Sequence, residues 1–206
     1  MFIYCRARGV VAVDRYIGRV RNEFPELDGL HRLRELILHV SAMYREDAWF
    51  GATRLNKVLY EADHETYRRF GKPITGIVYV KEKQGPVPRE MQGILRDMQA
   101  EGLINIRHVP HPLAPQRRLR RVEPEKKADL IFMTVDARHV LDGVIMARWG
   151  ESADSASART HGIAWEIANM RDPIPYEAAF LSDRLITQED IERTEELSRR
   201  FGWGSY

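Results

Sequence analysis

The stretch from Gly51 to Ile106 reads GATRLNKVLYEADHETYRRFGKPITGIVYVKEKQGPVPREMQGILRDMQAEGLINI, and it decides the fold. It opens on apolar side chains at the spacing that places them along one side of a helix: Leu55, Val58, Leu59 and Ala62. This pattern predicts a helix that begins at Thr53 and ends at Gly71 and Pro73. No catalytic motif lies within the stretch, so it favours a domain that works by presenting a binding surface rather than as an enzyme.

The second half of the stretch predicts a strand, a turn and another helix. Residues 74–81 carry β-branched and aromatic side chains on both faces, as in a short strand that is covered on both sides. Gly85, Pro86 and Pro88 then predict a rigid turn. Pro88 also suits the first turn of the next helix, and Gly102 is placed to end that helix.

Flanking segments extend this central part. A helix is predicted over residues 30–45, with Asp28 available as its cap. Residues 1–29 mix five arginines with isolated apolar side chains, and we interpret them as an N-terminal arm or a short helix. Residues 186–206 predict a C-terminal surface helix and tail, because apolar side chains are sparse there.

A β-hairpin is predicted after Gly102, from residues 103–109 and 117–122 with a proline-rich loop between them. A fourth helix follows, with Asp136 as its cap, and residues 152–160 predict a further short helix or turn. A helix followed directly by a hairpin is the order of elements in a winged helix. The fold class is therefore expected to be mainly α with a small β component, a compact helical domain containing a short strand and a winged-helix-like β-hairpin.

Composition narrows the class of protein. The chain has 206 residues, 44% of them apolar, which suits one sizeable core. Its net charge is only +2, so any attraction to phosphates must come from local clustering. Cys5 is the one cysteine and cannot form an internal disulfide, and no early apolar run is long enough for a signal peptide or a membrane span. These features predict a cytoplasmic protein with no membrane partner.

Catalytic and metal motifs are missing from the sequence. The seven histidines include no HExxH pair, and there is no phosphate loop, no GxGxxG fingerprint and no GxSxG elbow. We therefore expect no metal site, no cofactor and no catalytic residues, and we predict that the protein is not an enzyme. One weaker enzymatic alternative uses Asp63 and His64 as acid and base, since Glu65 adjoins them.

The central residues resemble the Panacea domain, the family of SocA-like antitoxins and phage-associated proteins. The residues that carry the resemblance are Leu55, Asn56, Lys57, Leu59, Tyr60, Ala62, Asp63, Gly71, Pro73, Ile74, Thr75, Gly76, Tyr79, Val80, Gly85, Pro86 and Val87, with a second group at Thr160, His161, Gly162 and Trp165. The resemblance covers roughly residues 30–185. It implies a mostly helical domain that neutralises a cognate toxin protein by direct contact, and the toxin is commonly encoded beside it.

Each of these motif residues also has a structural interpretation. Asp63 follows Leu59 by one helical turn, so we predict a buried carboxylate that holds the 74–81 segment against the helix. Gly76, Gly85 and Pro86 are expected to serve backbone geometry. His161 and Trp165 are four residues apart and are predicted to stack on one helical face, with partner recognition as the alternative role.

Arg117, Arg118, Arg120 and Arg121 offer the argument for nucleic acid or an acidic protein partner. Strand alternation places two of them on each face of the hairpin, so at least one pair should reach solvent. The preceding helix, residues 88–100, carries acidic residues that oppose phosphate. The alternative to an antitoxin is thus a winged-helix-like DNA-binding regulator, or an antitoxin that also regulates its own operon. The sequence leaves a homo-oligomer open.

Overall fold

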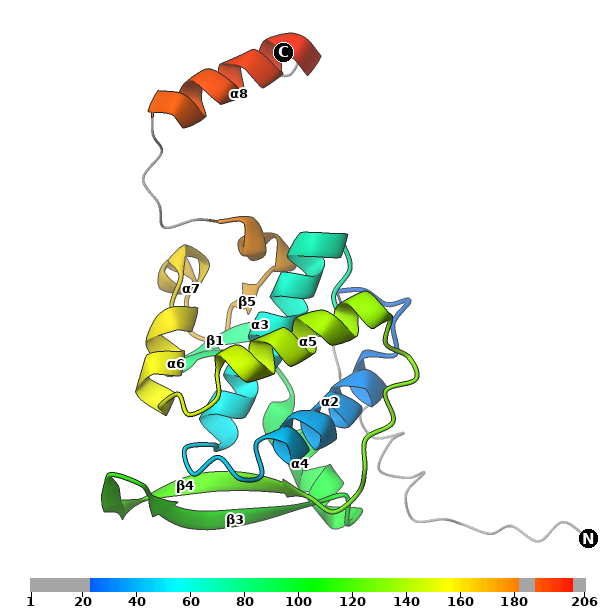
Figure 1. The fold of residues 1–206 in the computed structure, drawn as a ribbon, viewed down its shortest axis with the longest axis vertical. Coiled ribbons are helices and arrows are strands. Elements are labelled where there is room, and N and C mark those ends of the chain that lie inside the picture. Colours follow the sequence, from blue (N-terminus) through cyan, green and yellow to red (C-terminus); the bar gives the residue numbers. More distant parts are fainter. Residues whose placement is uncertain (1–22, 182–187, 202–206) are drawn as a thin grey trace, which may run out of the picture.

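Helices dominate the fold, as the sequence predicts, and two small antiparallel sheets complete it (Figure 1). The computed structural model describes residues 23–181 and 188–201. The elements, in chain order, are α2 (Gly29–Met43), α3 (Ala52–Phe70), β1 (Tyr79–Glu82), β2 (Gly85–Pro88), α4 (Met91–Ala100), β3 (Ile104–His111), β4 (Ala114–Pro124), α5 (Val135–Ala147), α6 (Ala153–Thr160), α7 (Ile163–Ile167), β5 (Pro173–Ile174), a 3-10 helix η1 (Tyr176–Phe180) and α8 (Gln188–Phe201).

The helix ends follow local signals in the sequence. The carboxylate of Asp28 accepts a hydrogen bond from the backbone N–H of His31 and so caps α2, as predicted. Gly71 ends α3 in the left-handed conformation, with φ at 70°. Beyond α4, Gly102 also has a positive φ, and the N–H of Leu103 donates to the carbonyl of Met98, which completes the hydrogen bonds of a Schellman motif.

The predicted turn at Gly85, Pro86 and Pro88 is wrong. These residues form strand β2, which pairs with β1 from Tyr79↔Pro88 to Glu82↔Gly85, and the turn lies at residues 83–84 instead. The strand order is β2-β1-β5, so β2 is an edge strand, where a proline that lacks an N–H is tolerated. Because β2 extends to Pro88, α4 begins at Met91 rather than at Pro88.

The predicted β3–β4 hairpin is confirmed, and its strands are longer than expected. They extend to His111 and Ala114, so most of the expected loop belongs to the strands.

The cap of α5 differs from the prediction, because the hydroxyl of Thr134 accepts the hydrogen bond from the N–H of Ala137. Asp136 lies inside the first turn, where its charge still favours the helix dipole.

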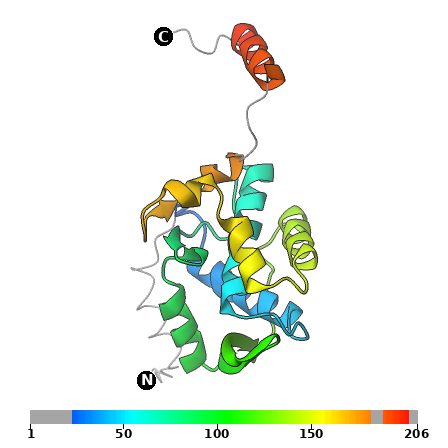
Figure 2. The same cartoon turned by 90° about the vertical axis from the view of Figure 1, so that its left-hand side faces the viewer.

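Helix α3 is the central element of the core. It packs against α2, α5, α6, β2, β4 and η1, so most of the other elements depend on it (Figure 2).

The segment before α2, which the sequence assigns to the arm, also joins the core from residue 23 onward. Phe24 packs edge-to-face on Tyr67 and Tyr176, and Leu27 is buried. The rest of the predicted arm lies outside the described residues.

Two glycines with the same backbone conformation give a matched test of this packing. Gly71 and Gly76 have φ values of 70° and 71°, but a Cβ on Gly76 would lie 2.8 Å from the Cβ of Phe24, whereas one on Gly71 would meet nothing within 4 Å. We expect Gly71→Ala to lower the free energy of unfolding by about 1 kcal/mol through backbone strain alone. We expect Gly76→Ala to lower it by roughly 3 kcal/mol, because overpacking adds to the strain. Urea denaturation measures both, and equal losses would contradict the packing of Phe24 on Gly76.

Candidate functional site

Asp63 lies at the centre of the motif residues and is completely buried on α3. Its carboxylate accepts hydrogen bonds from the backbone N–H of Thr75 at 2.8 Å and from the hydroxyl of the same residue. The hydroxyl of Tyr79 donates to it at 2.8 Å, and that of Tyr176 lies 3.4 Å away. The carboxylate therefore joins α3 to the segment before β1, to β1 itself and to η1. This arrangement is the structural clamp that the sequence predicts for Asp63.

Burial dominates the ionisation of Asp63 and His64. Burial raises the pKa of Asp63, and the hydrogen bonds from Thr75 and Tyr79 oppose that rise. Burial lowers the pKa of His64 to about 4, so its ring is neutral at pH 7. The Nδ1 of His64 lies 3.0 Å from the carbonyl oxygen of Tyr60, which assigns the ring proton to Nδ1 as the donor. The Nε2 of His64 is buried without a hydrogen-bond partner among the described residues, and His64 also lines a pocket of about 240 Å³ between α3 and α6.

Lys57 is a buried cation placed against the β1–β2 hairpin. Its side chain is 1% exposed, and its Nζ donates to the carbonyl of Pro86 at 3.1 Å. Within the part of the chain that the structure describes, it forms no ion pair with a carboxylate. Burial lowers the pKa of Lys57 to about 7. A Cβ on Gly85, which has a φ of 98°, would lie 2.6 Å from this Nζ, so glycine is required there.

His161 and Trp165 stack as predicted, with ring centroids 3.7 Å apart and an interplanar angle of 1°. They do not share a helical face, because His161 follows the end of α6 and Trp165 lies on α7. The indole N–H of Trp165 donates to the carbonyl of Glu82. The Nζ of Lys81 lies 4.3 Å from the centre of the Trp165 ring, and it donates to the carbonyl of Ala168 at 2.9 Å. These contacts fasten α7 to the β1–β2 hairpin.

The helix that is fastened in this way exposes apolar side chains. None of the residues of α7 is buried. Ile163, Ile167 and Met170 are 37%, 76% and 53% exposed, and we refer to these three residues as the apolar ridge. Ile163 and Ile167 lie on α7 and Met170 follows it by three residues. Several exposed apolar side chains on one short segment are typical of a protein interface.

The four arginines of β4 divide into two pairs. Arg117 and Arg118 are exposed and form no hydrogen bond or ion pair with the described residues. Arg120 donates to the side-chain oxygen of Gln92 on α4 at 2.6 Å. Arg121 donates to the carbonyls of Tyr44 and Arg45, just beyond the end of α2. Among the described residues, Arg117 and Arg118 thus have side chains without a partner, but they lie on opposite faces of the strand and are not the same-face pair that was expected. Arg120 has a partner and stays half-exposed.

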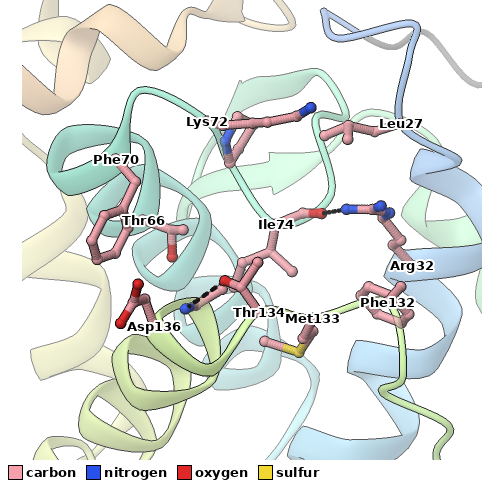
Figure 3. Close-up of a pocket in the computed structure, with 12 residues that line it drawn as sticks. Leu27, Arg32, Thr66, Phe70, Lys72, Ile74, Phe132, Met133, Thr134 and Asp136 are labelled. Atoms are coloured by element: carbon pink, nitrogen blue, oxygen red, sulfur yellow. Dashed lines mark hydrogen bonds between the residues drawn. The ribbon is translucent and has the colours of Figure 1, made fainter.

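A groove of about 340 Å³ opens between α2, the end of α3 and the start of α5 (Figure 3). Its polar groups mostly have partners within the protein: Arg32 donates to the carbonyl of Ile74 and lies over the ring of Phe132, and Lys72 pairs with Glu26. None of the residues predicted for the site lines this groove. Apolar side chains, among them Phe70, Phe132 and Met133, make up much of the rest of its lining.

The remaining motif residues support the clamp and the hairpin. Tyr60 packs edge-to-face on Tyr79, with ring centroids 5.3 Å apart. Asn56 is half-buried, and its Oδ1 is buried without a hydrogen-bond partner among the described residues. Val87 is half-buried in β2.

The sequence alone does not reveal the roles of Tyr176 and Lys81, because their contacts join segments more than 80 residues apart in the chain.

Across the described residues, 23–181 and 188–201, no group of three or more His, Cys, Asp or Glu side chains is arranged to hold a metal ion. No helix in the same ranges combines the length and the apolar character needed to cross a membrane.

Comparison with known protein families gives one match. Residues 55–166 match the family described as "Antitoxin SocA-like, Panacea domain", and they make up more than half of the chain. The matched range begins on α3 and ends on α7, so it contains the clamp, both hairpins and the His161–Trp165 stack. No curated protein and no solved structure gives a significant match.

Replacing Asp63 tests the clamp. We expect Asp63→Ala to lower the free energy of unfolding by roughly 3 kcal/mol, because the hydroxyl of Tyr79 and both the N–H and the hydroxyl of Thr75 lose their acceptor in the core. Glu65→Ala is the control, since Glu65 lies on the same helix and pairs only with the exposed Arg68 and Arg69. That change should cost about 1 kcal/mol or less. Similar losses for the two variants would mean that Asp63 is not a clamp.

The buried Lys57 predicts a pH dependence of stability. Burial gives Lys57 a pKa of about 7 in the folded protein, whereas an exposed lysine in the unfolded chain has its ordinary pKa of 10.5. At any pH between 7 and 10.5 the unfolded chain therefore binds more protons than the folded protein. The free energy of unfolding should therefore rise with pH above 7, by roughly 2 kcal/mol between about pH 7 and pH 9.

Urea denaturation at several pH values measures this rise. Lys57→Met should remove it, because the variant has no group to titrate at this position. Lys72→Met, at a lysine that is exposed on the surface, should leave it unchanged. A rise that persists in Lys57→Met would show that another group is responsible.

Proposed function

Because the chain belongs to the family of SocA-like antitoxins with a Panacea domain, we propose that it neutralises a cognate toxin protein by binding it directly. The observation that carries this proposal is the match over residues 55–166. The toxin is the partner, and the natural candidate for it is the product of the neighbouring reading frame. The complex would act in the cytoplasm.

We further propose that the protein carries out no chemistry of its own. Two features support this. The carboxylate of Asp63 accepts its hydrogen bonds from Thr75 and Tyr79 within the domain, and Asp63 is 0% exposed. A substrate in solvent therefore cannot contact it. His64 is also buried, and its pKa of about 4 makes it a poor base at neutral pH.

The apolar ridge is the surface that best fits the toxin. It lies at the end of the matched range, and it rests on residues that the family resemblance singles out, His161 and Trp165. Its side chains are held on a fixed element by Lys81 and by the Trp165 indole, so little flexibility is lost when a partner covers them. Ile167 is the most exposed of the three and is the expected anchor.

Co-expression with the neighbouring reading frame tests the proposed function. The chain should restore growth to cells that make the toxin, and the two proteins should co-purify. A toxin that stays active, together with no complex, would rule the proposal out.

Single substitutions test the position of the interface. Ile167→Asp should abolish co-purification and rescue, because a charge replaces an apolar contact. Leu113→Asp is the matched control, since Leu113 is 78% exposed at the tip of the β3–β4 hairpin. Ile167→Asp should keep the thermal stability of the wild-type protein. If it still binds the toxin, the interface lies elsewhere and the ridge assignment is wrong.

A further inference from the structure

The β3–β4 hairpin and its continuation carry a local excess of positive charge. Residues 104–127 contain seven Lys and Arg and two acidic residues, whereas the whole chain has a net charge of only +2. One of the two acids, Glu123, pairs with Arg107 at 3.5 Å near the base of the hairpin, away from Arg117 and Arg118. Such a local excess attracts phosphates even when the overall charge is small.

Strand geometry assigns the free arginines to different sides of the hairpin. Side chains alternate along a strand, so Arg118 lies on the same side as Arg120, and Arg117 lies on the other side. Arg120 reaches Gln92 on α4. The side that carries Arg118 therefore continues onto α4, and both views of the fold place α4 next to the hairpin (Figures 1 and 2).

The outward side of α4 is not acidic, although its sequence suggests that it is. Its exposed polar side chains are Gln92, Arg96 and Gln99. Glu101, the acid at the end of the helix, forms an ion pair with Arg34 of α2, and its side chain is only 14% exposed. Asp97 is half-buried, with one carboxylate oxygen sequestered from solvent. Glu90, the N-cap residue of α4, is half-exposed and forms no ion pair with the described residues, so repulsion of phosphate remains at this end of the helix.

We propose that this face, formed by Gln92, Arg96 and Gln99 of α4 together with Arg118 and Arg120 of the hairpin, binds double-stranded DNA. The helix supplies side chains for the edges of the bases in the major groove, where Gln and Arg are suitable donors. The hairpin acts as the wing, and Arg118 contacts the phosphate backbone beside the groove. This function is separate from toxin binding, because the apolar ridge contributes no residue to the face.

DNA fits this face better than an acidic protein does. A protein interface usually has an apolar centre, whereas the five residues of this face are all Gln or Arg. An α-helix beside a β-hairpin also matches the dimensions of a major groove and its flanking backbone.

Fluorescence anisotropy with a duplex from the region upstream of the gene tests the proposal. The wild-type protein should bind, and its affinity should fall steeply between about 50 and 200 mM salt. The double variant Arg96→Ala with Arg118→Ala should weaken binding and flatten the slope of log affinity against log salt by about one, for the lost phosphate contact of Arg118, while the loss of Arg96 removes a base contact. Arg117→Ala is the matched control, because it removes the same charge from the opposite side of the strand and should leave the slope nearly unchanged.

Several outcomes would overturn the proposal. One is the absence of binding at low salt, and another is an equal loss for Arg117→Ala, which would mean that binding does not use the α4 side. Competition by single-stranded RNA at least as effective as by duplex DNA would exclude a duplex site. All variants should still neutralise and co-purify with the toxin. If the double variant loses the toxin and keeps DNA binding, the face serves the toxin instead.

Discussion

The structure depends on one buried carboxylate. A charged or polar group in the core is stable only when its hydrogen bonds are satisfied, and Asp63 obtains them from Thr75 and Tyr79. These two residues must approach α3 to supply the donors, and the hydroxyl of Tyr176, which donates to the carbonyl of Ile77, closes over the same carboxylate at 3.4 Å. This requirement brings β1 and η1 onto the central helix, and Gly76 in its left-handed conformation allows the chain to turn around the carboxylate. The β1–β2 hairpin is then in place to meet Lys57.

Much of the fold could be predicted because its signals are local. Asp28 and Gly71 define helix ends through contacts within one turn, and such contacts can be read from adjacent residues. The errors have a common cause. Pro86 and Pro88 resemble a turn unless one knows that β2 is an edge strand, and that position is set by residues far along the chain. Thr134 and Asp136 are both good caps, and only the observed backbone shows which one is used.

The site was predictable only in part, for the same reason. Helical spacing places Asp63 on the buried side of α3, so its role as a clamp could be inferred. Tyr176, one of its partners, lies 113 residues away and has no local feature that links it to α3. Lys57 looks like an ordinary solvent-exposed lysine in the sequence, and only the packing of Gly85 and Pro86 shows that it is buried. The exposure of Arg117 and Arg118, unlike that of Arg121, also depends on tertiary contacts.

The position of α3 links the two surfaces proposed for the toxin and for DNA. Its N-terminal end meets β4, since a Cβ on Gly51 would lie 3.3 Å from the carbonyl oxygen of Arg120. Its middle supports β2 and α6, and α6 leads directly to α7 and the apolar ridge. The ridge and the DNA-binding face therefore rest on the same rigid helix but lie on separate parts of the surface (Figures 1 and 2). The proposed toxin site and the proposed DNA site therefore share no residue, and binding at one does not by itself occupy the other.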